Sequence, residues 1–119
     1  MSDNDRRLEV TEDGDVIRVR FLDRNILEES NIQQIGEQLT RLVDQATPPK
    51  LLINFEQVEH LSSAALGTLI TINNRIRQKG GQLRLSNIDP QIYEVFVITK
   101  LNKLFQIFDD AEQARASFK

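Results

Sequence analysis

Residues 50–55 form a run that is apolar at every position except Lys50 and Asn54. The run is far too short to span a membrane. A strand of this composition has to be covered on both faces, which is typical of the middle of a parallel or mixed sheet. The rest of the chain must therefore supply the elements that cover it.

The segment before this run has the pattern of an amphipathic helix. Apolar residues recur at spacings of three and four from Ile32 to Ala46, which gives one stripe that must face a core. Ser30 and Gln33 have the spacing of a capping box, so we expect the helix to begin at Ser30. Two prolines follow Thr47 and end the helix, because the residue before a proline avoids the helical conformation.

A second helix is expected from about residue 63 to residue 79. A glycine pair at 80–81 suits a left-handed exit at its C-terminus. Its apolar residues recur along one face, as in a helix packed on a sheet: Ala65, Leu69, Ile72 and Ile76.

Further strands are predicted near both ends of the chain. Residues 8–21 have the pattern of a hairpin, since the Asp13-Gly14 dipeptide tolerates the positive φ that a tight turn needs. Residues 82–86 alternate between apolar and polar, and residues 104–108 form a last short strand.

Two more helices follow the later strands. Asp89 before Pro90 indicates an N-cap and a first helical turn, and Asp109 or Asp110 can cap a terminal helix. Strands and helices thus alternate after the hairpin, which implies crossover connections. We expect an α/β fold with a mixed, mostly parallel β-sheet of four to five strands and about four α-helices packed on it.

The length and composition narrow the class of protein. A chain of 119 residues suits a single domain over residues 1–119, with residues 1–7 as a flexible N-terminus. It has no cysteine, and its 15 Lys and Arg are dispersed among 18 Asp and Glu for a net charge of -3. No disulfide or long basic block can therefore form, and a protein partner is expected rather than nucleic acid. Without a signal-peptide core or a membrane-length apolar run, cytoplasmic residence without membrane insertion is the simplest expectation.

Small residues are densest from Leu61 to Gly67, between the apolar strand and the second helix. Ligands and partners of open α/β sheets meet the carboxyl ends of strands, so Ser62 and Ser63 should lie at the functional edge. On one interpretation a serine here only caps the helix. On the other, a phosphoryl group added here would meet the free N–H groups and the positive dipole of a helix start, while its charge disrupts an interface.

Catalytic and cofactor sites are not indicated. His60, the one histidine, lies three residues before Ser63, but no G-x-S-x-G elbow accompanies the pair, so we expect no catalytic residue and a solvated loop histidine. One histidine without cysteine does not make a metal site. The chain has no Walker loop and no G-x-G-x-x-G motif, so no cofactor is expected.

The stretch from Leu51 to Asn87 resembles the signature of the STAS domain family, of the anti-sigma factor antagonist type found in bacteria. The likeness lies in an apolar strand, a short turn, the small-residue core from Ser62 to Gly67 and an amphipathic helix. The turn and strand at 80–87 and the ending at 97–108 resemble the family as well. The order of elements matches over nearly the whole chain, although only the Ser62 to Gly67 core is specific to the motif.

The resemblance implies a transcription regulator that is not an enzyme and that binds, when unphosphorylated, a serine kinase acting as an anti-sigma factor. The kinase would bind the ATP, and a serine phosphatase is implied as a further partner. The phosphorylated serine of the family falls on Ser63, with Ser62 as the second choice. The expected partner-binding residues lie in the strand-end loops and at the start of the second helix: Asp23, Asn54, Ser62, Ser63, Ala64, Gly67 and Asn87.

Several positions depart from the common family pattern. Ser62 and Asn54 stand where acidic residues are common, and Ala64 stands where a second Ser or Thr is frequent. The lost carboxylates make the local field less negative, which changes kinase selectivity or means that no kinase acts here. One alternative is therefore a non-phosphorylated STAS scaffold in a stress-signalling complex, or an accessory subunit of a transporter. Asp23 matches an acidic family position, with a turn aspartate as the equal alternative.

Overall fold

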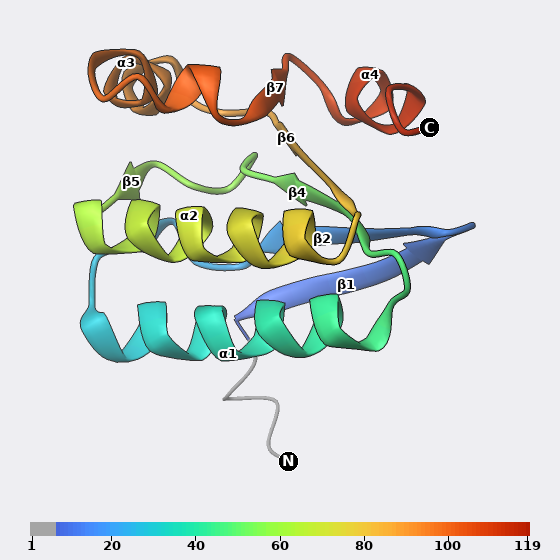
Figure 1. The fold of residues 1–119 in the computed structure, drawn as a ribbon. Coiled ribbons are helices and arrows are strands. Elements are labelled where there is room, and N and C mark those ends of the chain that lie inside the picture. The colour runs from blue at the N-terminus through green and yellow to red at the C-terminus, as the bar shows by residue number, and fades with distance from the viewer. Residues whose placement is uncertain (1–6) are drawn as a thin grey trace.

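The computed structural model of the protein describes residues 7–119, and the flexible N-terminus expected over residues 1–7 lies outside this part except for Arg7. Helices pack against a central sheet (Figure 1). The main sheet contains β1 (Leu8–Asp13), β2 (Val16–Phe21), β4 (Lys50–Asn54), β6 (Gln82–Ser86) and β7 (Gln106–Phe108), and a small sheet contains β3 (Asn25–Ile26) and β5 (His60–Leu61). The helices are α1 (Glu29–Gln45), α2 (Ser63–Gln78), α3 (Pro90–Ile98), α4 (Ala111–Ala116) and the 3-10 helix η2 (Leu101–Lys103).

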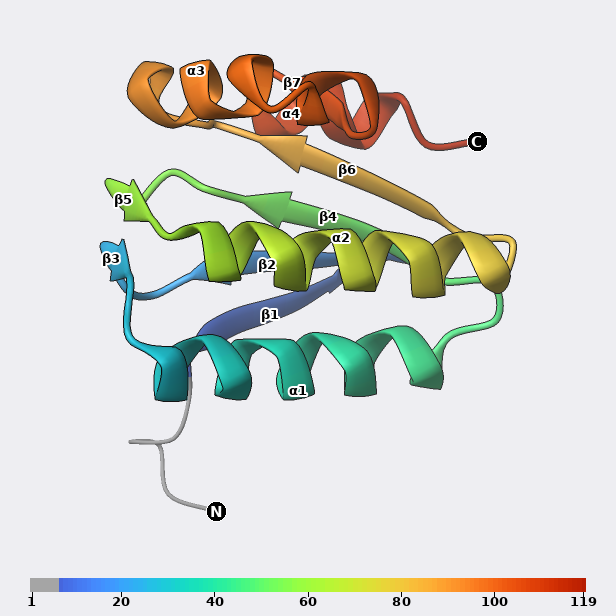
Figure 2. The same cartoon turned by 60° about the vertical axis from the view of Figure 1, so that its left-hand side comes forward.

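The main sheet has the strand order β1-β2-β4-β6-β7. β1 and β2 form the predicted antiparallel hairpin, and all other neighbours are parallel. Gly14 takes the hairpin turn with a φ of 63°, a conformation that costs glycine little. The predicted mixed, mostly parallel sheet with four α-helices is therefore confirmed. The carboxyl ends of the parallel strands share one edge, where β3 and β5 also lie (Figure 2).

The two faces of the main sheet are covered by different helices. α1 and α2 lie side by side over one face, while α4 packs on the other (Figure 2). On the α4 face, Ala114 packs against Val16 and Leu52. Ile53 points to the α1 and α2 face, and both it and Leu52 are at most 1% exposed. β4 is thus covered on both faces, as its apolar composition predicts.

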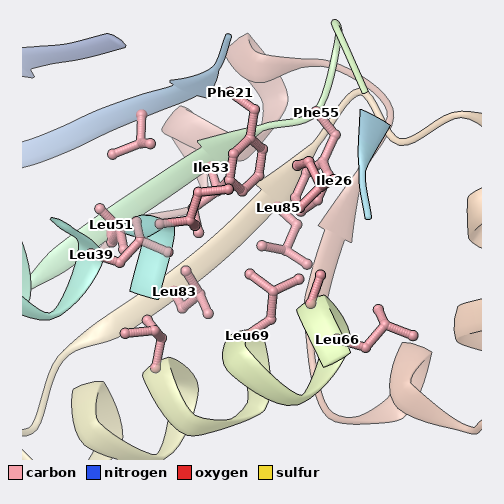
Figure 3. Packing of buried hydrophobic residues seen from close by; sticks show 14 of the residues in the cluster. Phe21, Ile26, Leu39, Leu51, Ile53, Phe55, Leu66, Leu69, Leu83 and Leu85 are labelled. Atoms are coloured by element: carbon pink, nitrogen blue, oxygen red, sulfur yellow. The ribbon is translucent and has the colours of Figure 1, made fainter. Parts of the chain in front are cut away.

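The core beside α1 and α2 is largely aliphatic and contains the aromatic pair Phe21 and Phe55 (Figure 3). The rings of Phe21 and Phe55 meet edge to face, with centroids 5.1 Å apart, an arrangement that aromatic quadrupoles favour. Leu39 from α1 and Leu69 from α2 belong to the same core and are nearly inaccessible to solvent. The residues that position α2 are therefore its inward-facing apolar side chains.

The start of α1 differs from the prediction. The helix begins at Glu29, and the capping box of Ser30 and Gln33 is wrong, because Glu28 holds the N-cap position without a side-chain hydrogen bond. Helices in proteins are stabilised chiefly by packing of an apolar face. In α1 this face is packed against the core, and its apolar stripe is buried at Ile32, Ile35, Leu39 and Val43.

The later helix ends agree with the sequence. Asp89 Oδ1 accepts a hydrogen bond from the Gln91 amide at the start of α3, and Asp110, not Asp109, caps α4. Gly80 has a φ of 72° after α2, which is the expected left-handed exit. No helix in the described part of the chain combines the length and the apolar character that crossing a bilayer requires.

An ion pair joins the C-terminal halves of α1 and α2. Arg75 donates from Nε to Asp44 Oδ1 over 2.8 Å and from its Nη2 to Oδ2 over 2.7 Å. This paired geometry matches the fork of a guanidinium to a carboxylate. The hydrogen bonds from Arg75 hold the pKa of Asp44 below its ordinary value of 3.8.

Candidate partner-binding site at the start of helix α2

Ser62 is the N-cap of α2. Its backbone is extended, with φ -79° and ψ 164°, and its Oγ accepts a hydrogen bond from the Ala65 amide over 3.2 Å. Its carbonyl oxygen accepts from the Leu66 amide, also over 3.2 Å. The Ser62 side chain thus satisfies one of the free amides of the first helical turn, which is what a capping serine does.

Ser63 is the first helical residue, and its side chain is exposed to solvent. In the part of the chain that the structure describes, no protein group forms a hydrogen bond with its Oγ. The hydroxyl therefore lies at the positive end of the helix dipole and is open to a transferase. Of the two serines in the motif, Ser62 caps the helix and Ser63 is exposed.

The segment that precedes the two serines is held by a small parallel sheet that the sequence analysis missed. β3 pairs with β5, so that Ile26 lies opposite Leu61. The Ile26 carbonyl accepts from the Ser62 amide over 3.1 Å, and the Arg24 carbonyl accepts from the amides of Glu59 and His60. Two-residue strands carry no periodic signal, so no pattern in the sequence could have indicated this pairing.

The outward surface of the first turns of α2 is small and uncharged. Ala64 and Gly67 are exposed, and no atom lies within 4 Å of the position where a Cβ on Gly67 would stand. The hydroxyls of Thr68 and Thr71 donate to the helix carbonyls four residues earlier. Another protein can therefore approach the α2 backbone closely beside Ser63.

Asp23 and Asn54 also lie at the carboxyl edge, but their side chains contact groups other than Ser63. Asp23 forms an ion pair with Arg7 over 3.4 Å. Asn54 Oδ1 accepts from the Glu56 amide over 2.8 Å, and its side chain faces the side of the sheet opposite to α2, beside Leu52 in the alternation of β4.

Asn87, the last of the predicted partner-binding residues, has a conformational role. Its φ is 60° and its Oδ1 is buried without a hydrogen-bond partner among the described residues. Asparagine adopts the left-handed conformation more readily than other residues with a Cβ. The structure thus brings Ser62, Ser63, Ala64 and Gly67 together on α2, while Asp23, Asn54 and Asn87 contact other parts of the fold.

Leu27 is an exposed apolar residue near Ser63 that the sequence analysis did not select. It directly follows Ile26, whose carbonyl accepts from Ser62, and 54% of its surface is exposed. A large apolar side chain that is half exposed beside an uncharged helix start is a suitable anchor for a protein partner. A leucine between a two-residue strand and a helix gives no signal in the sequence, because either a buried or an exposed position is possible there.

The chain is similar to known proteins over most of its length. The model of the STAS domain matches residues 8–114. BtrV of Bordetella bronchiseptica, named for a proposed role as an anti-sigma factor antagonist, is 26% identical over 96 residues, which are 81% of this chain and 82% of BtrV.

Solved structures show the same fold. An anti-sigma-factor antagonist (STAS) domain protein from Planctomyces limnophilus superposes with a TM-score of 0.82 at 24% identity, over 90% of this chain and 93% of that one. The phosphorylated form of SpoIIAA, a Bacillus cell fate determinant, gives a TM-score of 0.70 at 17% identity, over 92% of this chain and 96% of that one. Because the STAS model spans most of the chain and the arrangement of strands and helices agrees, this protein belongs to the STAS domain family.

Proposed function

We propose that the protein acts as an anti-sigma factor antagonist, which binds an anti-sigma factor with serine kinase activity through the start of α2 and is switched off by phosphorylation of Ser63. The observation that carries this proposal is the division between the two serines. Ser62 is engaged as the helix cap, while the Ser63 hydroxyl is exposed and has no partner among the described residues.

A phosphate on Ser63 would change binding without changing the fold. It adds a charge of about -1.5 to -2 at neutral pH, at a helix start that favours anions. The surrounding α2 surface is small and uncharged, so a partner that packs closely on it would have to bury this charge. Each tenfold loss of affinity requires only about 1.4 kcal/mol, and one uncompensated charge in a packed interface is sufficient for that.

The relatives agree with this type of regulation. BtrV and the Planctomyces limnophilus protein are both described as anti-sigma factor antagonists. SpoIIAA, which has the same fold, has been solved in a phosphorylated and an unphosphorylated form. Leu27 and the α2 surface from Ser63 to Gly67 are the parts of this chain that we assign to partner binding.

The direct test is phosphorylation by the kinases of the protein's own cell extract. The purified protein is incubated with extract and ATP, and modified residues are mapped by mass spectrometry. We expect one phosphate, on Ser63, and none on Ser62. An unmodified intact mass would instead favour a non-phosphorylated STAS scaffold, an alternative suggested by the absence of carboxylates at Ser62 and Asn54.

Variants of Ser63 test the effect of charge on binding. The anti-sigma factor recovered by pull-down without ATP should bind Ser63→Ala like the wild type and Ser63→Glu at least about tenfold more weakly. Ser30→Glu is the matched control, because Ser30 is also an exposed serine in the first turn of a helix. Equal affinity of Ser63→Glu and Ser30→Glu would contradict the proposed mechanism.

A further inference from the structure

The face of the sheet opposite to α1 and α2 contains a hollow that the proposed function does not use. Its volume is about 460 Å³, within the range of small-molecule sites. The hollow is lined by three neighbouring strands, β1, β2 and β4, and by the first residue of α4. It exists because α4 is short and covers this face only around Val16 and Leu52. The sheet itself therefore separates the hollow from Ser63.

Polar side chains of three strands meet in this hollow along one rung of the sheet. Glu9 on β1 lies opposite Arg20 on β2, and Arg20 lies opposite Asn54 on β4. Residues that are paired across strands project from the same face. The next rung contributes Arg18, whose guanidinium is held by Asp13 over 3.2 Å. The hollow thus has two guanidinium groups and an amide on its floor.

The Arg20 guanidinium leaves one of its hydrogen-bond donors without an acceptor. Its Nη2 donates to Glu9 Oε2 over 3.1 Å, but its Nε is buried and has no hydrogen-bond partner among the described residues. A guanidinium binds a carboxylate best when both Nε and an Nη donate in parallel. Glu9 is about half exposed, so its bond to Arg20 is weak and can be exchanged for one to another anion. A carboxylate that displaces Glu9 from Nη2 can therefore also accept from Nε, the donor that is left without a partner among the described residues.

The charge of the lining shows that a simple anion is not the best ligand. Three carboxylates share the hollow with the two guanidinium groups, at Glu9, Asp13 and Glu56. Glu12 borders the hollow, but it is paired with Ile17 and so projects from the other face of the sheet. Glu56 has no side-chain ion pair among residues 7–119. A ligand that carries an ammonium group as well as a carboxylate would match both kinds of charge.

We propose that this hollow is a binding site for a small zwitterion of the amino acid class, with its carboxylate on the Nε and Nη2 of Arg20 and its ammonium group near Glu56. The site uses no residue of the α2 surface and is independent of the phosphorylation switch. Because the chemistry of the two ends is defined while the length between them is not, ligands of different lengths are needed to test it.

The test is an NMR titration of the full-length protein labelled with ¹⁵N. Glycine and 4-aminobutanoate are the zwitterionic probes, and acetate and methylammonium each represent one half of such a ligand. We expect saturable shifts of β1, β2 and β4 amides and of the Arg20 Nε–H signal, with one zwitterion binding at least about tenfold more tightly than either half. Amides of α2 should not shift.

Two variants of Arg20 separate binding from folding. Arg20→Lys keeps the charge but loses the fork, and Arg20→Gln loses both, so both should weaken zwitterion binding while the dispersed spectrum of a folded protein is retained. Ser63→Glu should bind the zwitterion like the wild type, whatever its effect on the anti-sigma factor. The proposal is overturned if no zwitterion gives saturable shifts in the hollow, if the half ligands bind equally well, or if Arg20→Lys binds unchanged.

Discussion

Ser62 and Ser63 are adjacent, yet their substitution should have different consequences. Ser62→Ala removes the cap hydrogen bond to Ala65 and should lower the free energy of unfolding by about 1 kcal/mol. Ser63→Ala removes an exposed hydroxyl without a partner and should stay within about 0.5 kcal/mol of the wild type. Urea denaturation followed by circular dichroism measures both. Equal losses in the two variants would show that the cap is not held as described.

The left-handed conformation of Asn87 predicts the effects of two substitutions there. Asn87→Ala should cost about 1 kcal/mol, because alanine adopts the left-handed conformation at a φ of 60° less readily than asparagine does. Asn87→Gly should be close to neutral, since glycine adopts positive φ freely. The same urea titrations distinguish them, and an alanine variant as stable as the glycine variant would be inconsistent with the strain.

For single residues, the sequence predicted which elements they belong to better than it predicted which groups their side chains contact. The small-residue core placed Ser62 and Ser63 at a helix start, which the structure shows. The ion pair of Asp23 with Arg7 could not be predicted, because Arg7 is also held by α1: its Nε donates to Gln34 Oε1 over 2.9 Å. Such contacts arise only when distant segments have already been brought together.

The first turns of α2 allow stability and binding to be tested in one variant. Gly67→Ala should raise the free energy of unfolding by about 0.8 to 1 kcal/mol, because alanine is the better helix former and its methyl group meets no neighbour. The same methyl group protrudes beside Ser63 and should weaken partner binding in the pull-down assay. Gly81→Ala is the control for a glycine-to-alanine change as such. The Cβ added at Gly81 would collide with the Pro49 carbonyl, so this variant should be less stable than the wild type. A Gly67→Ala protein with unchanged binding would remove this turn from the interface.

The ion pair between α1 and α2 should be visible in the pH dependence of stability. The pKa of Asp44 is lowered in the folded protein, so its contribution is present above the unfolded value of 3.8 and is lost as the pH falls through the lower folded value. Wild type should therefore lose more stability than Asp44→Asn between neutral pH and acid. Thermal unfolding over a pH series compares the two, and parallel curves would mean that the ion pair does not stabilise the fold.

The elements themselves followed from periodicity wherever they were long. α1, α2 and β4 were predicted within about one residue, because each has an extended apolar pattern that packing must satisfy. The predicted capping box at the start of α1 was wrong. A capping motif is a local signal, and the burial of the apolar stripe that begins at Ile32 outweighs it. The last strand is shorter than predicted, beginning at Gln106, because Leu104 and Phe105 form the turn that follows η2.

At the scale of the whole molecule, the proposed switch should leave the fold intact. Ser63 is exposed at a helix start, where a negative charge is favourable by about 0.3 to 1 kcal/mol. Ser63→Glu should therefore unfold at the same or a slightly higher urea concentration than wild type, with amide shifts confined to residues near β5 and the start of α2. Loss of stability or shifts that spread over the main sheet would indicate a conformational mechanism instead of a charge at an interface.

The overall architecture was predictable, and the empty part of one sheet face was not. Alternation of strands and helices led to the order of the layers, but the extent to which α4 covers its face depends on the length of a six-residue helix and on the contacts of Arg115 with Asp13. Neither the length of α4 nor the contacts of Arg115 can be read from a periodic pattern in the sequence. The hollow around Arg20 could be found only from the structure.

The pairing of β3 with β5 has a consequence for any enzyme that modifies Ser63. The segment that precedes Ser63 is held by main-chain hydrogen bonds to Arg24 and Ile26, which lie more than thirty positions earlier in the chain. A synthetic peptide with the sequence around Ser63 would lack these hydrogen bonds and would not reproduce the conformation of this segment in the folded protein. Substrate choice by such an enzyme would then depend on a conformational epitope rather than on a linear consensus.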